Sequence, residues 1–244
     1  MNLLVLTYHY FHRDGPKDIK KEDYSFSVSL ENFAGHCAEL TSPDFRLMDP
    51  ARLNDASQYH GEPDRQILIT IDDGHQSVGE AAEIIVGRKI APVLNVIAGL
   101  VGRESYLDWS ALRMLATQGF SIQSHSMSHH DLTRLEPMDL RAELEQSKKL
   151  IEDNIGLPVT MLAAPMGRLN VRVIETALEL GYTLIMSSFT GINRLSDDFT
   201  CLRRFQVKGD PRTLAIGRYF NPVSGVRIMG AAKNAAKKVM NRFR

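Results

Sequence analysis

The 244-residue sequence is poor in several features that would assign it to a special class of protein. Its only cysteines, Cys37 and Cys201, lie far apart and outside any Cys-x-x-Cys pattern, which argues against a disulfide framework and a thiolate zinc site. No uninterrupted apolar run approaches ~18 residues, so no membrane-spanning helix is predicted. The 29 basic and 29 acidic residues give a formal net charge of zero, which excludes an overall positive electrostatic potential that would attract nucleic acid.

The composition is otherwise that of an ordinary globular chain. Hydrophobic residues make up 43% and charged residues 24%, which excludes a disordered, collagen-like or coiled-coil protein. Residues 1–9 lack the basic start and the small-residue cleavage site of a signal peptide, so they predict a first strand. The missing signal-peptide features and the scarcity of cysteine lead us to expect a cytoplasmic protein. Peripheral contact with the inner face of the membrane is compatible with that location.

Short apolar runs alternate with longer segments of helical period, as expected for βα units around a parallel sheet. Most of these runs are apolar on both faces, which is typical of strands buried on both sides. Seven strands indicate an α/β barrel or a distorted relative. The expected strands are 3–9, 66–71, 91–97, 120–124, 160–164, 183–187 and 201–207, and the expected helices are 30–40, 78–88, 110–118, 138–155 and 171–180.

The end of the chain differs in charge from the rest. After Asp210 the sequence contains basic residues but no acidic one. Residues 211–244 therefore form a basic C-terminal extension to a domain of residues 1–210. Apolar residues between Met229 and Phe243 can share one helical face, which predicts a short amphipathic helix able to lie on an anionic membrane surface. A solvated tail is the alternative.

One apolar strand, 67–71, ends in two adjacent acids, Asp72 and Asp73, and then turns at Gly74. Neighbouring side chains in extended backbone point in opposite directions, so one carboxylate can bind a metal while the other stays beside it as a base. A turn or a helix cap explains a single acid equally well. The adjacent pair favours a catalytic site.

A second expected strand ends in histidines, at His125, His129 and His130. Two imidazoles and one carboxylate leave a coordination position open for water, which is typical of a catalytic rather than a structural metal site. The spacing of His125 and His129 allows one tight loop or helical turn to hold both. We expect His130 and His75 to be spare histidines.

These segments resemble the polysaccharide deacetylase family, which shares the nodulation-type chitooligosaccharide deacetylase domain of carbohydrate esterase family four. Residues 70–74 resemble its Thr-Phe-Asp-Asp-Gly motif, with Ile71 in place of phenylalanine. Residues 125–129, His-Ser-Met-Ser-His, resemble its second motif, in which serine or threonine follows the first of two histidines. The similarity extends from Leu3 to about Val207. It implies a single-domain, distorted (β/α)7 barrel and a metal-dependent N-deacetylase.

The resemblance also implies roles for individual residues. Asp73, His125 and His129 would hold a divalent ion, most often Zn²⁺, with Co²⁺ or Ni²⁺ as other candidates, since such a site accepts several first-row metals. Asp72 would be the general base that takes a proton from the attacking water. In the segment Pro165-Met166-Gly167, the backbone N–H near Met166 would bind the oxyanion.

Two departures from the common family pattern shape the remaining expectations. In the third motif, many members have arginine where this chain has Ala163. Alanine at that position is typical of the poly-N-acetylglucosamine deacetylase branch, and Arg204 would then orient Asp72. No histidine follows His130, so the usual late acid is missing, and His9 at the end of the first strand would fill that role. The alternatives are that Arg204 is a surface arginine and that His9 is a histidine of the core. Trp109 is a candidate for stacking on a sugar ring, with a core position as the alternative.

The expected activity is removal of N-acetyl groups from amino sugars in a polysaccharide, an oligosaccharide or a lipid-linked glycan precursor, with release of acetate. A catalytically impaired glycan-binding protein on the same fold is one alternative. An amidohydrolase or deformylase acting on a different amide is another. Because binding alone requires no general base, the acidic pair with both histidines favours the enzyme. No nucleic-acid partner is expected.

Overall fold

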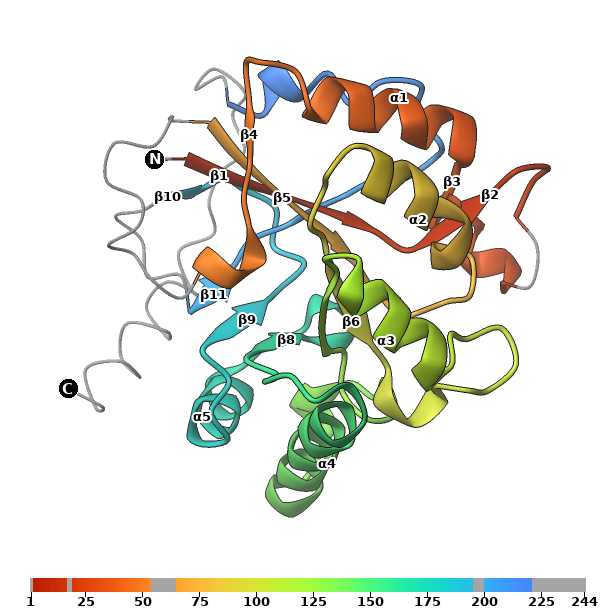
Figure 1. Cartoon of the computed structure of the whole chain (residues 1–244). Helices are drawn as coiled ribbons and strands as arrows, with labels where there is room; N and C mark the ends of the chain where they lie inside the picture. Colours follow the sequence, from red (N-terminus) through yellow and green to blue (C-terminus); the bar gives the residue numbers. More distant parts are fainter. Residues whose placement is uncertain (1, 17–18, 54–64, 195–199, 221–244) are drawn as a thin grey trace.

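A single, nearly closed sheet of mostly parallel strands forms the centre of the molecule (Figure 1). The computed structural model describes residues 2–16, 19–53, 65–194 and 200–220. Seven strands pair in sequence order, and every neighbouring pair among them is parallel. They are β1 (Asn2–Tyr8), β5 (Arg65–Ile71), β6 (Val93–Val96), β7 (Ser121–Ser124), β8 (Met161–Ala163), β9 (Leu184–Met186) and β11 (Cys201–Leu202).

One short segment brings the two ends of this sheet together. β11 pairs with β9, and β12 (Phe205–Gln206), only two residues later, pairs with β1. The expected seventh strand is therefore two short strands separated by Arg203 and Arg204, because the chain leaves one edge of the sheet and joins the other. This arrangement confirms the predicted distorted (β/α)7 barrel.

Four further strands lie outside the predicted set. β10 (Asn193–Arg194) runs antiparallel to β1, and β4 (Arg46–Leu47) extends β5. β2 (Tyr10–His12) pairs with β3 (Ser27–Ser29) in a separate two-stranded sheet. Runs of only two or three residues carry too little periodicity to be recognised in a sequence.

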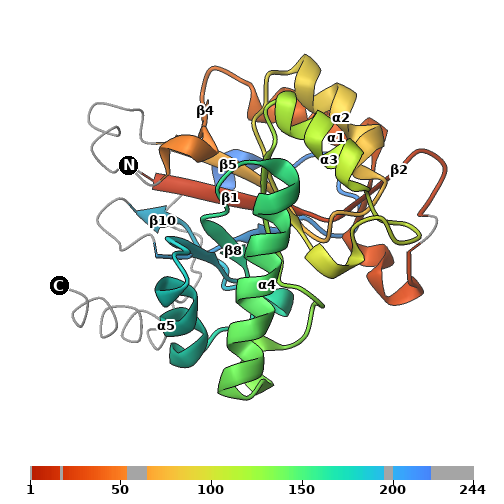
Figure 2. The ribbon, with the colours of Figure 1, turned by 60° about the horizontal axis from the view of Figure 1, so that its bottom comes forward.

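The five predicted helices are present and lie around the sheet (Figures 1 and 2). Ser29, Asp108 and Asn170 cap the first, third and fifth helices through side-chain oxygens that accept backbone N–H groups. Gly156 ends the fourth helix in the left-handed region, at φ 76°. The helices are α1 (Leu30–Leu40), α2 (Val78–Gly87), α3 (Trp109–Thr117), α4 (Pro137–Ile155) and α5 (Val171–Glu179).

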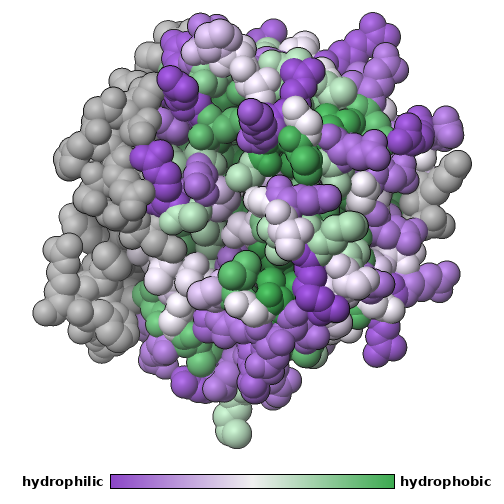
Figure 3. Space-filling model, in the orientation of Figure 1, coloured by the Kyte–Doolittle hydropathy of each residue, from purple (hydrophilic) through white to green (hydrophobic). Residues whose placement is uncertain are grey.

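The side chains of β1 alternate between two apolar layers. Leu4, Leu6 and Tyr8 join the large core cluster that the helices also enter, and Leu3 and Val5 join a smaller cluster with residues of the opposite strands. Strands buried on both sides explain the continuous apolar runs. Hydrophilic side chains dominate the face of the molecule in Figure 3, and apolar areas show between them. Among the described residues, none of the helices has the length and apolarity needed to cross a membrane.

The described part of the C-terminal extension packs against α1. The Glu39 carboxylate accepts hydrogen bonds from the backbone N–H groups of Leu214 (3.0 Å) and Ile216 (2.6 Å), and the His36 ring contacts the Pro211 carbonyl (2.6 Å). The amphipathic helix expected further along the extension lies outside the described residues and stays a prediction.

Candidate metal centre and active site

A cavity of about 430 Å³ lies where the carboxyl ends of the parallel strands meet. Its wall includes residues from the ends of β1, β5 and β7, together with Arg204 from the segment that closes the sheet. The carboxyl ends of barrel strands are the usual place for an active site, because side chains from many strands converge there. The expected residues that line it are His9, Asp72, Asp73, His125, His129, Met166 and Arg204.

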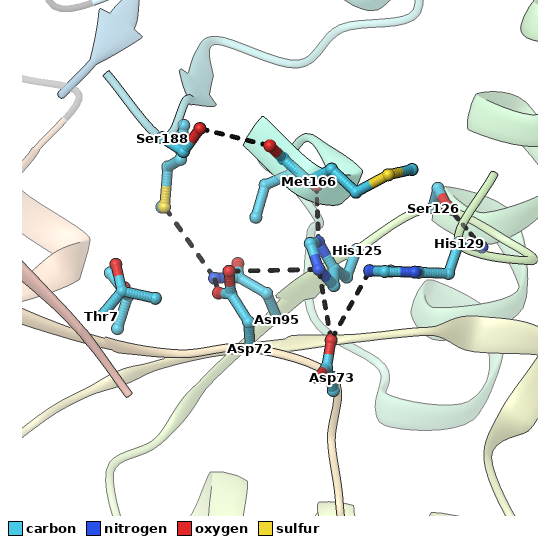
Figure 4. A network of polar contacts seen from close by, with 12 residues as sticks. Thr7, Asp72, Asp73, Asn95, His125, Ser126, His129, Met166 and Ser188 are labelled. Carbon is cyan, nitrogen blue, oxygen red and sulfur yellow. Dashed lines mark hydrogen bonds and ion pairs between the residues drawn. The ribbon is translucent and has the colours of Figure 1, made fainter. Parts of the chain in front are cut away.

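Asp73, His125 and His129 come together at this cavity, with ligand atoms that all lie within 4.8 Å of one another. The Oδ1 atom of Asp73 is 3.4 Å from His125 Nε2 and 3.7 Å from His129 Nε2. Figure 4 shows both rings directed toward this carboxylate. The sequence predicted this grouping, and the structure brings the three side chains together.

The local backbone explains how one short loop holds both histidines. Ser126 and His129 have φ angles of 67° and 61°, so the chain turns sharply after β7. The Ser124 hydroxyl accepts the Ser126 N–H, and the Ser126 hydroxyl accepts the His129 N–H, each at 3.1 Å. Asp73 is also left-handed, at φ 75°, a conformation that aspartate tolerates better than most residues. The hydroxyls of Ser124 and Ser126 therefore hold the loop in shape.

The donor set fits a divalent first-row ion. The Nδ1 atom of His125 lies 2.7 Å from the Ala163 carbonyl, so this nitrogen carries a proton, and Nε2, which faces Asp73, is the atom that would bind an ion. Burial lowers the pKa of His125, but Asp72 and Asp73 outweigh burial and raise it, so an ion would displace the Nε2 proton. Burial and, next to it, the neighbouring His125 lower the pKa of His129 to about 4, so its ring is neutral at physiological pH. Burial alone raises the pKa of Asp73, but its hydrogen bond with His125 and nearby histidines outweigh burial and keep it ionised. Neutral imidazoles and a carboxylate are the forms that bind metal.

Asp72 is buried beside this group and is held through one of its oxygens. Its Oδ1 atom accepts hydrogen bonds from Arg204 Nη1 at 2.9 Å and from Asn95 Nδ2 at 2.8 Å. The other oxygen, Oδ2, is 4.0 Å from His125 Nε2. Burial raises the pKa of Asp72, but the positive charge of Arg204, followed by His125 and His9, outweighs it and lowers the pKa to about 2. The contact between Arg204 and Asp72 is the one expected from the sequence.

His9 lies at the same cavity, directly after β1. Its Nδ1 atom is buried and has no hydrogen-bond partner among the described residues. Burial lowers the pKa of His9, although the nearby Asp73 and Asp72 partly oppose that effect. A partly buried imidazole beside two carboxylates is therefore available for proton transfer.

Met166 contributes backbone as well as side chain to the cavity. It has a φ angle of 55°, and its N–H has no hydrogen-bond acceptor within the described ranges. Gly167 follows at φ 65°, where an added Cβ would lie 2.2 Å from three atoms of Ser188. The turn therefore requires glycine at position 167 and leaves the Met166 N–H free for a ligand.

Two expected substrate-binding residues are not brought to the cavity surface. Trp109 is the first residue of α3 and packs against the hydrophobic core, because its helix lies on the outside of the sheet. Its predicted stacking on a sugar is therefore not supported, and the core alternative describes it better. Pro165 is buried and precedes Met166 without lining the cavity.

Sequence reasoning missed three residues at this site. His75, expected to be a spare histidine, is 4% exposed and lines the cavity, whereas His130 is exposed as expected. Asn95 holds Asp72, and a polar residue within the apolar strand 93–96 was the available signal. Tyr10 donates a hydrogen bond to Asp73 Oδ2 at 2.7 Å, and only its position next to His9 pointed to it.

Comparisons with known proteins agree with this geometry. The family profile described as polysaccharide deacetylase matches residues 60–185, more than half of the chain. The Bacillus subtilis (strain 168) protein YxkH is 24% identical over 197 residues, which cover 80% of this chain and 71% of YxkH. A chitooligosaccharide deacetylase of Rhizobium leguminosarum bv. trifolii is 23% identical over 123 residues, which cover 50% of this chain and 55% of that protein.

Solved structures share the fold. The Streptococcus pyogenes deacetylase PplD in complex with acetate has a TM-score of 0.76 and 21% identity, covering 85% of this chain and 93% of PplD. IcaB from Ammonifex degensii has a TM-score of 0.74 and 23% identity, covering 84% of this chain and 91% of IcaB. Likeness at this level of identity establishes the barrel and leaves substrate and metal to be argued from the site.

Proposed function

The chain belongs to the polysaccharide deacetylase family, and from this premise we propose that it is a metal-dependent N-deacetylase of amino sugars in a glycan or a lipid-linked glycan precursor. The reaction consumes water and releases acetate and a free amine. The observation that carries the proposal is the buried Asp72, fixed by Arg204 beside the group Asp73, His125 and His129. A site that only binds glycan requires no such base.

Each residue has a part in the proposed reaction. A divalent ion held by Asp73, His125 and His129 would polarise the acetyl carbonyl and activate the attacking water. Asp72 Oδ2 takes a proton from this water as its oxygen forms a bond to the carbonyl carbon. The Met166 N–H donates to the carbonyl oxygen as negative charge develops on it. The C–N bond then breaks as His9, in its protonated form, delivers a proton to the departing nitrogen. Asp72 loses to solvent the proton it took from water, and His9 takes one back, so both groups return to their starting states.

The test is acetate release from N-acetylglucosamine oligomers by metal-stripped protein, with Zn²⁺, Co²⁺ or Ni²⁺ added back. We expect metal-dependent release, with Asp72→Asn and His9→Ala slowing turnover by at least ~100-fold while glycan binding persists. Glycan binding without release, unaffected by either variant, supports the glycan-binding alternative instead. Release of formate or of another acid from a non-sugar amide supports the amidohydrolase alternative.

We also propose that the basic extension, residues 211–244, brings the enzyme to an anionic membrane face, where a lipid-linked precursor would be presented. Its support is the sequence, in which basic residues follow Asp210 without any acid. Deleting residues 228–244 should weaken binding to vesicles that contain phosphatidylserine and leave binding to neutral vesicles unchanged. Equal binding by both proteins contradicts the proposal.

A further inference from the structure

The two oxygens of Asp73 have separate partners. Oδ1 faces the two histidines, at 3.4 Å from His125 and 3.7 Å from His129, whereas Oδ2 accepts the hydrogen bond from the Tyr10 hydroxyl at 2.7 Å. Within the described ranges, Tyr10 supplies the one hydrogen bond to Oδ2. Asp73 is only 8% exposed, so solvent does little to replace this donor. One bond from the protein thus fixes the rotation of the carboxylate.

Tyr10 is itself held rigidly. It begins β2, where Tyr10 pairs with Ser27 of β3, and the next residue, Phe11, donates its N–H to the Ser77 hydroxyl at 3.1 Å. The tyrosine ring meets the ring of His75 edge to face, with centroids 5.2 Å apart and an interplanar angle of 86°. Ser77 and His75 lie in the loop directly after Asp73. Strand β2, which carries the Tyr10 hydroxyl, therefore contacts the loop after Asp73 at two further points, Ser77 and His75.

The Tyr10 hydroxyl contacts Oδ2, whereas Oδ1 is the oxygen of Asp73 that lies near the two histidines. The effect of Tyr10 on a bound ion therefore acts through Asp73. Hydrogen bonds to the outer atoms of metal ligands fix their orientation, and their loss typically weakens metal affinity by about 10- to 100-fold. Without the hydroxyl, Oδ2 would be left unpaired in a buried position, or the carboxylate would rotate and present both oxygens to the ion.

We propose that Tyr10 is a positioning residue that restricts Asp73 to ligation through Oδ1 alone and thereby sets the affinity of the site for its divalent ion. This inference rests on the metal site of the proposed function. It adds to that function a residue that the family motifs in the sequence did not single out. It also gives a role to the hydroxyl of Tyr10, which lines the cavity beside Asp73.

The experiment measures binding of Zn²⁺ alone to the metal-stripped full chain, in competition with a chromogenic chelator. Tyr10→Phe removes one oxygen atom and keeps the ring on His75. We expect its Kd for Zn²⁺ to rise by about 10- to 100-fold. The thermal midpoint of the metal-free protein should fall as well, because Oδ2 loses its donor in a buried position. The Co²⁺-substituted variant should also show an altered absorption spectrum, because a freely rotating carboxylate changes the coordination number.

Tyr182→Phe is the matched control. The Tyr182 hydroxyl is also buried, and it donates to the Leu144 carbonyl at 3.0 Å, away from the cavity. This variant should lower the thermal midpoint and leave both the Kd for Zn²⁺ and the Co²⁺ spectrum unchanged. A merely structural role of Tyr10 predicts the same behaviour for both variants.

The outcomes separate the two proposals. An unchanged Kd in Tyr10→Phe, or an equal rise in both variants, overturns the role of Tyr10 even if the wild-type protein releases acetate. A selective rise in Tyr10→Phe supports that role, and if the wild type then releases no acetate from any glycan, only the proposed function fails. A wild-type protein that binds none of Zn²⁺, Co²⁺ and Ni²⁺ overturns both.

Discussion

Replacing Arg204 by methionine isolates the interaction that keeps Asp72 charged inside the barrel. The Arg204 side chain is 2% exposed, and it donates to Asp72 Oδ1 at 2.9 Å and to the Ser187 carbonyl at 3.0 Å. Methionine is shorter but comparable in volume and carries no charge, so Arg204→Met removes the cation and these hydrogen bonds without leaving a large cavity. Asp72 then remains buried without its strongest partner.

The expected loss of stability follows from the pKa of Asp72. In the folded protein this pKa is about 2, against 3.8 for an ordinary aspartate. A difference of about two units corresponds to roughly 2.5 kcal/mol in favour of the ionised, folded form. Because the folded pKa is depressed, this contribution is present above about pH 4 and is lost as the pH falls toward 2. Removing one partner of a buried ion pair typically costs about 3–5 kcal/mol, so we expect a loss of about 4 kcal/mol at pH 7.

The pH dependence of the loss distinguishes a buried charge from a packing defect. In Arg204→Met, burial is opposed by the weaker influence of the histidines and by the hydrogen bond from Asn95, so we expect the pKa of Asp72 to rise above its unfolded value. The carboxyl then becomes protonated as the pH is lowered, and the gap to the wild type should narrow between pH 7 and pH 5. Adding Asp72→Asn to Arg204→Met should restore about half of the lost stability, since no charge is left unpaired.

Urea unfolding of metal-free protein, followed by circular dichroism, measures the loss of stability at pH 7, the smaller loss at pH 5 and the recovery in the double variant. Metal must be absent because a ligand that binds only the folded state adds its own stabilisation. Equal losses at the two pH values, together with a double variant no more stable than Arg204→Met, would refute the charge argument and leave Arg204 as a packing residue.

Three other substitutions test separate features. Asn95→Leu frees Asp72 to rotate, so it should lower kcat about 10- to 100-fold in acetate-release assays and leave the Kd for Zn²⁺ unchanged. The control Gln123→Leu, which removes another buried amide, should lower only the thermal midpoint. Gly167→Ala should cost about 2–4 kcal/mol in urea unfolding, because its Cβ would meet Ser188 at 2.2 Å in a left-handed backbone; a loss below ~1 kcal/mol contradicts this. Glu39→Ala should speed proteolytic cleavage within residues 211–220, and an unchanged digestion pattern would show that its hydrogen bonds to Leu214 and Ile216 do not hold the segment.

Much of the fold was predictable because its main elements carry strong periodic signals. Helix α1 was expected at 30–40 and occupies Leu30–Leu40, and the expected strand 66–71 is β5, Arg65–Ile71. Their apolar runs are long enough for the period to be visible. The two-residue strands β11 and β12 were merged into one, because the polar break at Arg203 and Arg204 is as short as the strands themselves.

The candidate site was predictable where its residues are neighbours in sequence. The pair Asp72 and Asp73 follows one strand, and His125 and His129 share one loop, so spacing predicted each pair, and the resemblance to the family joined the two pairs in one site. Asn95 and Tyr10 escaped notice because their partners are 23 and 63 residues away, and only the paired strands bring them together. The sequence left Trp109 open between a sugar contact and a core position, because residue type does not reveal which side of a helix faces the core.

The closing segment of the sheet has a consequence for the order in which the enzyme matures during synthesis. Arg204 lies between β11 and β12 and meets Asp72 across 132 residues of chain. A nascent chain that ends before this segment contains both acids and both histidines but neither the edge that joins β1 nor the cation for Asp72. Its Asp72 stays hydrated, because a charged carboxylate without a partner resists burial. Closure of the barrel and pairing of the Asp72 charge with Arg204 therefore occur together, late in synthesis. Contacts distant in sequence dominate this step, which makes it slow relative to helix formation.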